Sequence, residues 1–277
     1  MPHKYDFEAL FGSKQFKDFG YIDAERSLRV VYPLATQKFP IGYIGDKNTP
    51  ADIGREVIEK TLGRNFGPIC HVSLAHESHN IVEIVKDKYV MPIVFSCDGL
   101  IVQRTGSSFP FVIETFLGDC ACIIIWSDRW IGYMHVGWPE IIQLPFGVIQ
   151  KFFEEWPDKN NEISIWMGPC ITGQSFERVN IPKNPSFLRQ YAKEPTEWGT
   201  RGFQLDHCIR YLIEVETSEM NVKSFSKADI DPYAECSWIH PNNKLWAASD
   251  QWYRRKGREL GFPIYSPRNS AMLFVEG

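Results

Sequence analysis

The chain has 277 residues, of which 44% are hydrophobic and 23% charged, a composition typical of a globular protein with a core of its own. Its net charge of −4 and its lack of a Lys/Arg stripe disfavour a nucleic-acid partner, and its apolar runs are far too short to cross a bilayer. The seven cysteines are scattered and the first residues lack the apolar stretch of a secretory signal, so we expect reduced thiols in a cytoplasmic protein.

The predicted elements alternate between strands and helices. Residues 1–40 have no clear period, so we expect an N-terminal arm or edge element there and a single domain over 41–277. A helix is predicted over 49–62, because Thr49 stands at the cap and Pro50 at the first helical position. Strand patterns follow at 72–76, 81–85, 89–95, 111–117, 121–126 and 130–136.

The second half of the chain continues this mixture. Helices are predicted over 141–156, 205–215 and 246–260, and strands over 163–167 and 272–275. The interleaving indicates an α/β fold of mixed α+β type, with layered sheet and helices in one domain.

The most informative stretch carries Cys120 and His135 on two apolar strands that flank Ser127 and Asp128. If these two polar residues form the turn of a hairpin, Cys120 lies directly opposite His135, with Cβ atoms roughly 4.5–5.5 Å apart. A thiol and an imidazole at this distance can share a metal ion or act as nucleophile and base. A turn one residue longer or shorter would put a neighbour of His135 opposite the thiol instead.

A third candidate donor is His76, which closes an alternating strand pattern, and His79 competes for the same role. Two His and one Cys suit a borderline-soft ion such as zinc, and three protein ligands with an open fourth position are typical of a catalytic site. Because free cysteine is among the most buried residue types, any single Cys more often packs than ligates. We assign Cys97, Cys208 and Cys236 to packing on this ground.

Over about residues 40 to 275 the sequence resembles the YfiH-like family, also called the laccase-domain or polyphenol-oxidase family. The family's Ala-Asp-Cys motif is matched in two of three positions by Gly-Asp-Cys at 118–120, and its His-Ala-Gly-Trp by His-Val-Gly-Trp at 135–138. Its Gly-Pro-Cys-Ile is reproduced at 168–171, and its C-terminal Ser and Gly-Arg match Ser249 and residues 257–258. These motifs follow one another in the family's order.

The resemblance implies a YfiH-like α/β fold with one zinc held by two His and one Cys, which by position are His76, Cys120 and His135. It also implies purine-nucleoside chemistry, namely phosphorolysis of adenosine, inosine or methylthioadenosine, or deamination of adenosine. The expected partner is therefore a small nucleoside, and Cys120 and His135 are the expected catalytic residues. A multicopper enzyme would need many more His ligands than the seven His available, so copper is disfavoured.

Two departures from the family pattern concern arginine. The family's His-Ala-Gly-Trp is usually followed by Arg-Gly, where this chain has Pro139 and Glu140, and its Ser-x-Arg-Arg ends here in Gln251 and Trp252. A guanidinium that binds phosphate through two hydrogen bonds cannot be replaced by Pro, Gln or Trp without losing its charge. We expect the metal site to be retained and phosphate handling to be weakened, which favours hydrolysis.

Two other functions stay open. With Cys120 as nucleophile and His135 as base, the chain would be a metal-free cysteine hydrolase. A catalytically altered relative that binds a ligand or partner would account for the replaced arginines but not for the retained Cys and His. Metal content separates the zinc enzyme from the cysteine hydrolase, because a chelator abolishes activity only in the zinc enzyme.

Overall fold

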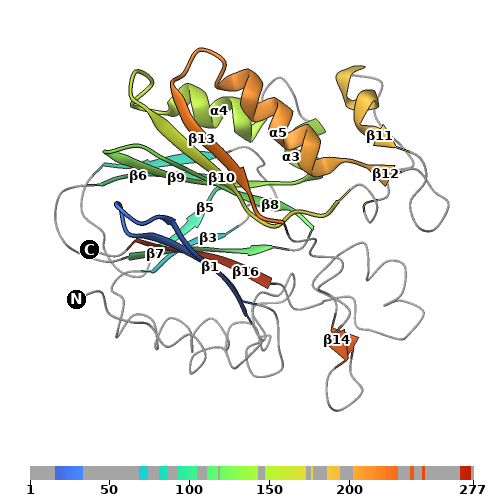
Figure 1. Cartoon of the computed structure of the whole chain (residues 1–277), viewed down its shortest axis with the longest axis horizontal. Coiled ribbons are helices and arrows are strands. Elements are labelled where there is room, and N and C mark those ends of the chain that lie inside the picture. Colours follow the sequence, from blue (N-terminus) through green and yellow to red (C-terminus); the bar gives the residue numbers. More distant parts are fainter. Residues whose placement is uncertain are drawn as a thin grey trace.

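The chain folds into two six-stranded sheets, and helices cover one face of the second sheet (Figure 1). The computed structural model describes residues 16–33, 69–73, 81–86, 93–104, 111–117, 119–142, 147–172, 176, 186–193, 202–229, 238–239, 245–246 and 269–275. This layered arrangement of sheets and helices is the mixed α/β fold that the sequence predicts.

Sheet 1 contains both ends of the described chain. Its strands in spatial order are β1 (Phe16–Asp23), β2 (Leu28–Pro33), β16 (Asn269–Val275), β7 (Phe111–Leu117), β3 (Ile69–Ser73) and β5 (Ile93–Ser96). The β1–β2 hairpin therefore forms one edge of this sheet and pairs with β16. A domain boundary near residue 40 stays a prediction.

Sheet 2 holds the hairpin that the sequence singles out. Its strands in spatial order are β13 (Val222–Lys227), β10 (Ile163–Met167), β8 (Ala121–Trp126), β9 (Trp130–Val136), β6 (Gly99–Gln103) and β4 (Val82–Val85). Two short pairs complete the strands of the described residues: β11 (Ala192–Lys193) with β12 (Gly202–Phe203), and β14 (Trp238–Ile239) with β15 (Leu245–Trp246).

Four helical segments accompany the sheets in the described part of the chain: α3 (Trp138–Ile142), α4 (Val148–Glu155), the 3-10 helix η1 (Ser186–Tyr191) and α5 (Leu205–Glu216). The single helix predicted over 141–156 is wrong, because α3 ends at Ile142 and α4 begins after an extended Gly147. Pro145 stands between them in the sequence, and proline lacks the N–H that a continuous helix needs. None of the helices among the described residues combines the length and apolarity that crossing a membrane requires.

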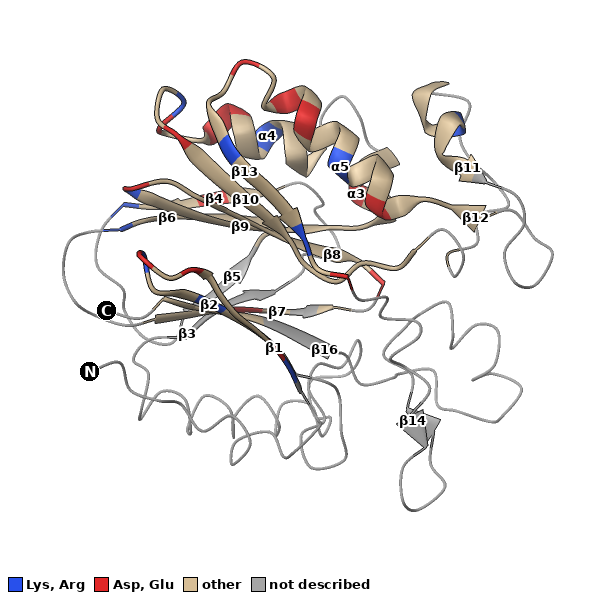
Figure 2. Ribbon diagram, in the orientation of Figure 1, with Lys and Arg blue, Asp and Glu red and all other residues tan. Residues whose placement is uncertain are grey.

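Strands β8 and β9 are buried along their whole length because sheet 2 lies between two apolar cores. On one face, Ile123 and Ile125 belong to the cluster that contains Phe152 of α4 and Ile209 of α5. On the other face, Ile124 shares a cluster with residues of both sheets. Among the described residues, many of the charged ones lie on the helices and near strand ends, with both signs interspersed (Figure 2).

The turns of two hairpins are tied together at one end of the sheets. The Trp126 indole Nε1 donates to Asp23 Oδ2 at 2.7 Å, and the Arg26 guanidinium donates to the same carboxylate at 2.8 Å. Arg26 also pairs with Asp128 in the β8–β9 turn. These contacts fix the β1–β2 turn against the far end of the hairpin that carries His135.

Several predictions fall outside the described residues. They are the helix over 49–62, the candidate donors His76 and His79, and most of the helix expected over 246–260. Strand β3 ends at Ser73, so the strand predicted over 72–76 begins earlier than expected. The replaced arginine positions at Gln251 and Trp252 also lie outside the described part.

Candidate functional site

The β8–β9 hairpin turns at Asp128 and Arg129, one residue later than the sequence pattern predicts. The Ser127 N–H donates to the Trp130 carbonyl at 2.9 Å, and the buried Ser127 hydroxyl accepts from the Trp130 N–H at 3.2 Å. Because Ser127 closes the turn instead of occupying its tip, every opposed pair shifts. Cys122 therefore lies opposite His135, and the predicted direct opposition of Cys120 and His135 is wrong.

Cys120 and His135 nevertheless lie close together. The shift keeps both residues on the same face of the sheet as diagonal neighbours, with Cys120 just before the first residue of β8. The thiol is near enough to the imidazole to interact with it electrostatically. Its sulfur also lies against Gly137, where an added Cβ would approach Sγ to 2.4 Å. Their roles as metal ligands stay predictions.

His135 is buried, and its ring nitrogens receive no hydrogen bond from the described residues. The residue is 5% exposed, and neither Nδ1 nor Nε2 has a hydrogen-bond partner in that part of the chain. Its backbone is well held, because the His135 N–H donates to the Asp98 carbonyl at 2.7 Å. A buried imidazole whose two nitrogens lack hydrogen bonds from the described residues is unusual in a protein interior, where buried polar groups are normally paired.

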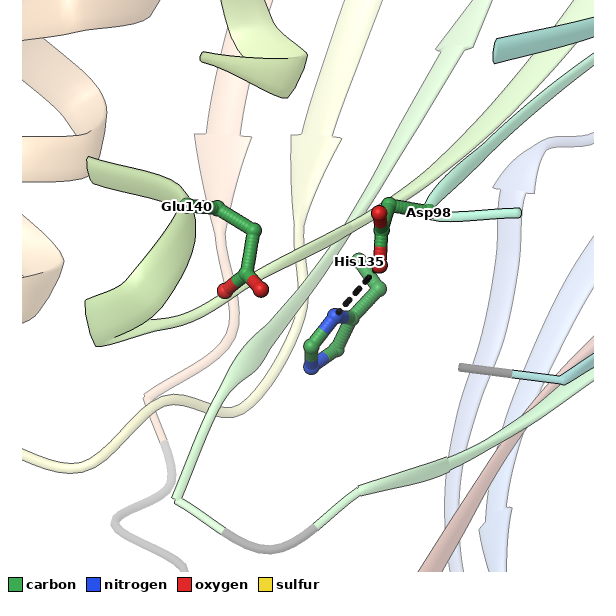
Figure 3. A group of neighbouring side chains, drawn as sticks. All are labelled: Asp98, His135 and Glu140. Atoms are coloured by element: carbon green, nitrogen blue, oxygen red, sulfur yellow. Dashed lines mark ion pairs between the residues drawn. The ribbon is translucent and has the colours of Figure 1, made fainter. Parts of the chain in front are cut away.

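Two buried carboxylates flank the imidazole (Figure 3). Asp98, which links β5 to β6, is 1% exposed, and its Oδ1 lies 3.9 Å from His135 Nδ1. Glu140, in the first turn of α3, is 3% exposed. One ligand atom from each of Asp98, His135 and Glu140 lies within 4.8 Å of the others, a separation that suits donors around a single metal ion.

The surroundings of His135 are anionic. Burial by itself lowers the pKa of the imidazole, but the neighbouring Cys120, Asp98 and Glu140 outweigh it, so the pKa of His135 is raised well above its usual value. Cys122 differs, because burial raises the pKa of its thiol to about 12 and leaves it inert at neutral pH. The site therefore favours a cation, either a protonated imidazole or a bound metal ion.

The Gly-Pro-Cys-Ile segment at 168–171 is hydrogen-bonded to the chain on both sides of the start of β8. The Gly168 N–H donates to the Cys122 carbonyl at 2.7 Å, and the Ile171 N–H donates to the Asp119 carbonyl at 3.1 Å. The Cys170 thiol lies 3.8 Å from that same carbonyl and is fully buried. This segment therefore positions the residues on both sides of the candidate ligand Cys120.

The sequence profile of the family described as multi-copper polyphenol oxidoreductase laccase matches residues 40–242. The chain belongs to this family. The resemblance stated from the motifs is thereby confirmed, whereas a search of curated proteins finds no match.

Solved structures share the fold of this laccase-family chain. The Neisseria meningitidis protein NMB0706 has a TM-score of 0.60 at 14% identity, covering 95% of this chain and 100% of its own. A hypothetical YfiH protein from Bacillus licheniformis has a TM-score of 0.56 at 12% identity, covering 90% and 93%. YlmD from Geobacillus stearothermophilus has a TM-score of 0.54 at 14% identity, covering 90% and 92%. These likenesses establish the YfiH-like fold.

Neither Asp98 nor Glu140 stands out in the sequence as a site residue. Glu140 has a local sequence signal for a helix cap. Gly137 is the N-cap residue of α3, and the Glu140 carboxylate three residues later accepts the Gly137 N–H at 2.7 Å. This contact is one of the two hydrogen bonds of a capping box. Asp98 has no such signal, since only the pairing of β6 with β9 brings it beside His135.

Proposed function

We propose that this laccase-family chain is a zinc-dependent enzyme of purine-nucleoside chemistry, with Cys120 and His135 as metal ligands. His76, or its neighbour His79, would supply the third. The observation that carries the proposal is the buried imidazole of His135, neither of whose ring nitrogens is hydrogen-bonded by a described residue. Leaving such a group unsatisfied costs about 1–3 kcal/mol, a cost that a bound ion removes.

The described donors fit a zinc ion better than a hard cation. A thiolate and an imidazole are preferred ligands of zinc, whereas magnesium and calcium take oxygen ligands only. Asp98 is placed to orient the imidazole, because its carboxylate lies on the Nδ1 side and leaves Nε2 for the metal. When bound, zinc would lower the pKa of a coordinated water toward neutrality and so supply a nucleophile.

Hydrolysis is the reaction that the site supports best. Where the family pattern has Arg-Gly, this chain places Pro139 and the buried Glu140 in the first turn of α3. A carboxylate cannot donate hydrogen bonds to phosphate as a guanidinium does. We therefore propose hydrolytic deamination of an adenosine-type nucleoside ahead of phosphorolysis.

Metal content tests the proposal first. Purified wild type should contain about one zinc per chain, as measured by elemental mass spectrometry, and Cys120→Ala and His135→Ala should each lose it. Cys208→Ala is the matched control, because that thiol is buried in α5 and should leave zinc content unchanged. Wild-type protein without zinc would refute the proposal. Zinc-loaded enzyme should then release ammonia from adenosine whether or not phosphate is present.

A cysteine hydrolase is the second candidate, because Cys120 is partly exposed while other described thiols are deeply buried. An adjacent imidazolium favours the thiolate and so makes a nucleophile. This candidate predicts activity that survives a chelator and is destroyed by alkylation of Cys120. Zinc binding without turnover of any nucleoside would instead favour a relative that only binds its ligand.

A further inference from the structure

We propose that the exposed face of α5 is the contact surface of a symmetric dimer, in which α5 of one copy packs antiparallel against α5 of a second copy of this chain. The helix lies on the outside of sheet 2, on the side away from sheet 1 (Figure 1). This surface uses none of the residues of the candidate metal site, so the inference does not depend on the proposed function.

Two large apolar side chains are exposed one turn apart on α5. Tyr211 is 40% exposed and Val215 is 46% exposed, and Tyr21 is the only other large hydrophobic residue of the described ranges that is this exposed. Tyr21 differs, because the Arg29 guanidinium stacks over its ring at 5.7 Å. Single exposed apolar side chains are ordinary, but a pair on one helix face favours a partner.

The Tyr211 ring is held by other rings within the chain. Its centroid lies 5.9 Å from that of Phe187 and 6.0 Å from that of Tyr191, both of which belong to η1. A ring that is already fixed loses little conformational entropy on association, and partly exposed tyrosines are typical anchors of protein interfaces. Tyr211 is therefore suited to the centre of a contact surface.

The exposed charges of α5 change sign along the helix. His207, with 63% of its side chain exposed, lies one turn before Tyr211, and Glu214, with 51% exposed, lies about one turn after it. Asp206 does not alter this order, because it is buried and paired with Lys227. The exposed face is therefore basic toward its N-terminal end and acidic toward its C-terminal end.

An antiparallel pairing makes this face complementary to itself. His207 and Glu214 are seven residues apart, about two turns, so they share a face with Tyr211 between them. About a two-fold axis beside Tyr211, each His207 lies opposite Glu214 of the second copy, and the two tyrosine rings pack at the centre. The imidazole donates an N–H to the carboxylate, and the contact occurs twice because such an interface is isologous.

Arg210 holds the acidic half of this face in place. Its Nε donates to Glu214 Oε1 at 2.8 Å, and its guanidinium stacks over the Phe225 ring of β13 at 5.0 Å. The Glu214 carboxylate is thus positioned before the second copy binds, which reduces the entropy that association costs.

Charge reversal with rescue, measured by sedimentation velocity of the full chain, tests the inference. Wild type should pass from monomer to dimer between about 1 and 500 µM, because a small interface supports only weak association. His207→Glu and Glu214→Lys each bring like charges together twice and should weaken association at least about tenfold. The double variant carries opposite charges with their signs exchanged and should recover most of the affinity.

The variants also control for effects within one chain. The contact of Arg210 with Glu214 is lost in both Glu214→Lys and the double variant, so recovery in the double variant reports the contact between copies. Glu25→Lys makes the same charge reversal in the exposed β1–β2 turn of sheet 1 and should associate like wild type. Because His207 and Glu214 are both more than half exposed, thermal unfolding followed by circular dichroism should be close to that of wild type.

Four outcomes would overturn the inference. A chain that stays monomeric at every concentration would leave the α5 face to a partner other than this chain. Dimers that both single variants leave intact would assign self-association to another surface. Loss of association in both single variants without recovery in the double variant would exclude the pairing of His207 with Glu214. Equal weakening by Glu25→Lys would assign the effect to net charge.

Discussion

The sulfur of Cys120 fills the space next to Gly137 that a side chain would occupy. A Cβ at Gly137 would come within 2.4 Å of Sγ and 3.0 Å of Glu140 Oε2, and the first of these distances is shorter than real Cβ contacts allow. The glycine therefore permits the thiol, the α3 cap and the imidazole of His135 to converge.

Gly137→Ala should damage the metal site without removing any donor. The added methyl group must displace Cys120 or Glu140. We expect a displaced Cys120 to cost at least the roughly 10–100-fold in metal affinity that loss of an outer-shell partner costs. A competition titration of zinc against a chromophoric chelator would measure this loss.

Gly132→Ala provides the control for that variant, because its Cβ would come within 2.3 Å of Phe152 in the core under α4. Overpacking there should lower the free energy of unfolding by about 1–3 kcal/mol and leave zinc affinity unchanged. Equal zinc affinities in Gly137→Ala and wild type would contradict the assignment of Cys120.

Asp98→Asn should weaken zinc binding although Asp98 is not a predicted ligand. The carboxylate lies 3.9 Å from His135 Nδ1, and we propose that it orients the ring. Loss of such an outer-shell carboxylate typically costs about 10–100-fold in metal affinity. The cobalt-substituted protein gives a second readout, since a changed ligand geometry shifts its visible absorption. Asp229→Asn, at an exposed position, should leave both measurements unchanged.

The cysteines should differ sharply in reactivity. Burial raises the pKa values of Cys97, Cys122 and Cys208 to about 12, so these thiols carry almost no thiolate at neutral pH. Cys120 is partly exposed and should react with iodoacetamide once a chelator has removed the metal. Peptide mapping by mass spectrometry would locate the label. Labelling of Cys122 ahead of Cys120 would contradict the difference in burial between these two thiols.

The sequence predicts the strands of this site better than it predicts their pairing. The strands over 121–126 and 130–136 are confirmed. The first is an unbroken apolar run, the second is interrupted by a polar residue only at His135, and polar turn residues separate the two. Their register differs because the hydroxyl of Ser127 closes the turn from inside, which residue polarity alone does not indicate. The site residue Asp98 depends on the pairing of β6 with β9, a long-range contact without a sequence period.

Acid should weaken the contact between the two hairpin turns through Asp23. Partial burial raises the pKa of Asp23, but hydrogen bonds from the Arg26 backbone, the Trp126 indole and the Arg26 guanidinium outweigh it, so the pKa is lowered from its ordinary 3.8. A lowered pKa means that the ionised carboxylate stabilises the folded state. This contribution is present in full above the ordinary pKa and is lost as the pH falls through the lowered value.

Asp23→Asn should therefore unfold more easily than wild type at neutral pH, and the difference should shrink in acid. Urea unfolding followed by fluorescence at several pH values between about 7 and 2.5 would measure both free energies of unfolding. Asp229→Asn, at an exposed position, should show no such convergence. A wild-type advantage that stays constant down to the lowest pH would mean that the Asp23 carboxylate is not ionised in these contacts. The Trp126 indole would then be held to the β1–β2 turn by its neutral hydrogen bond alone.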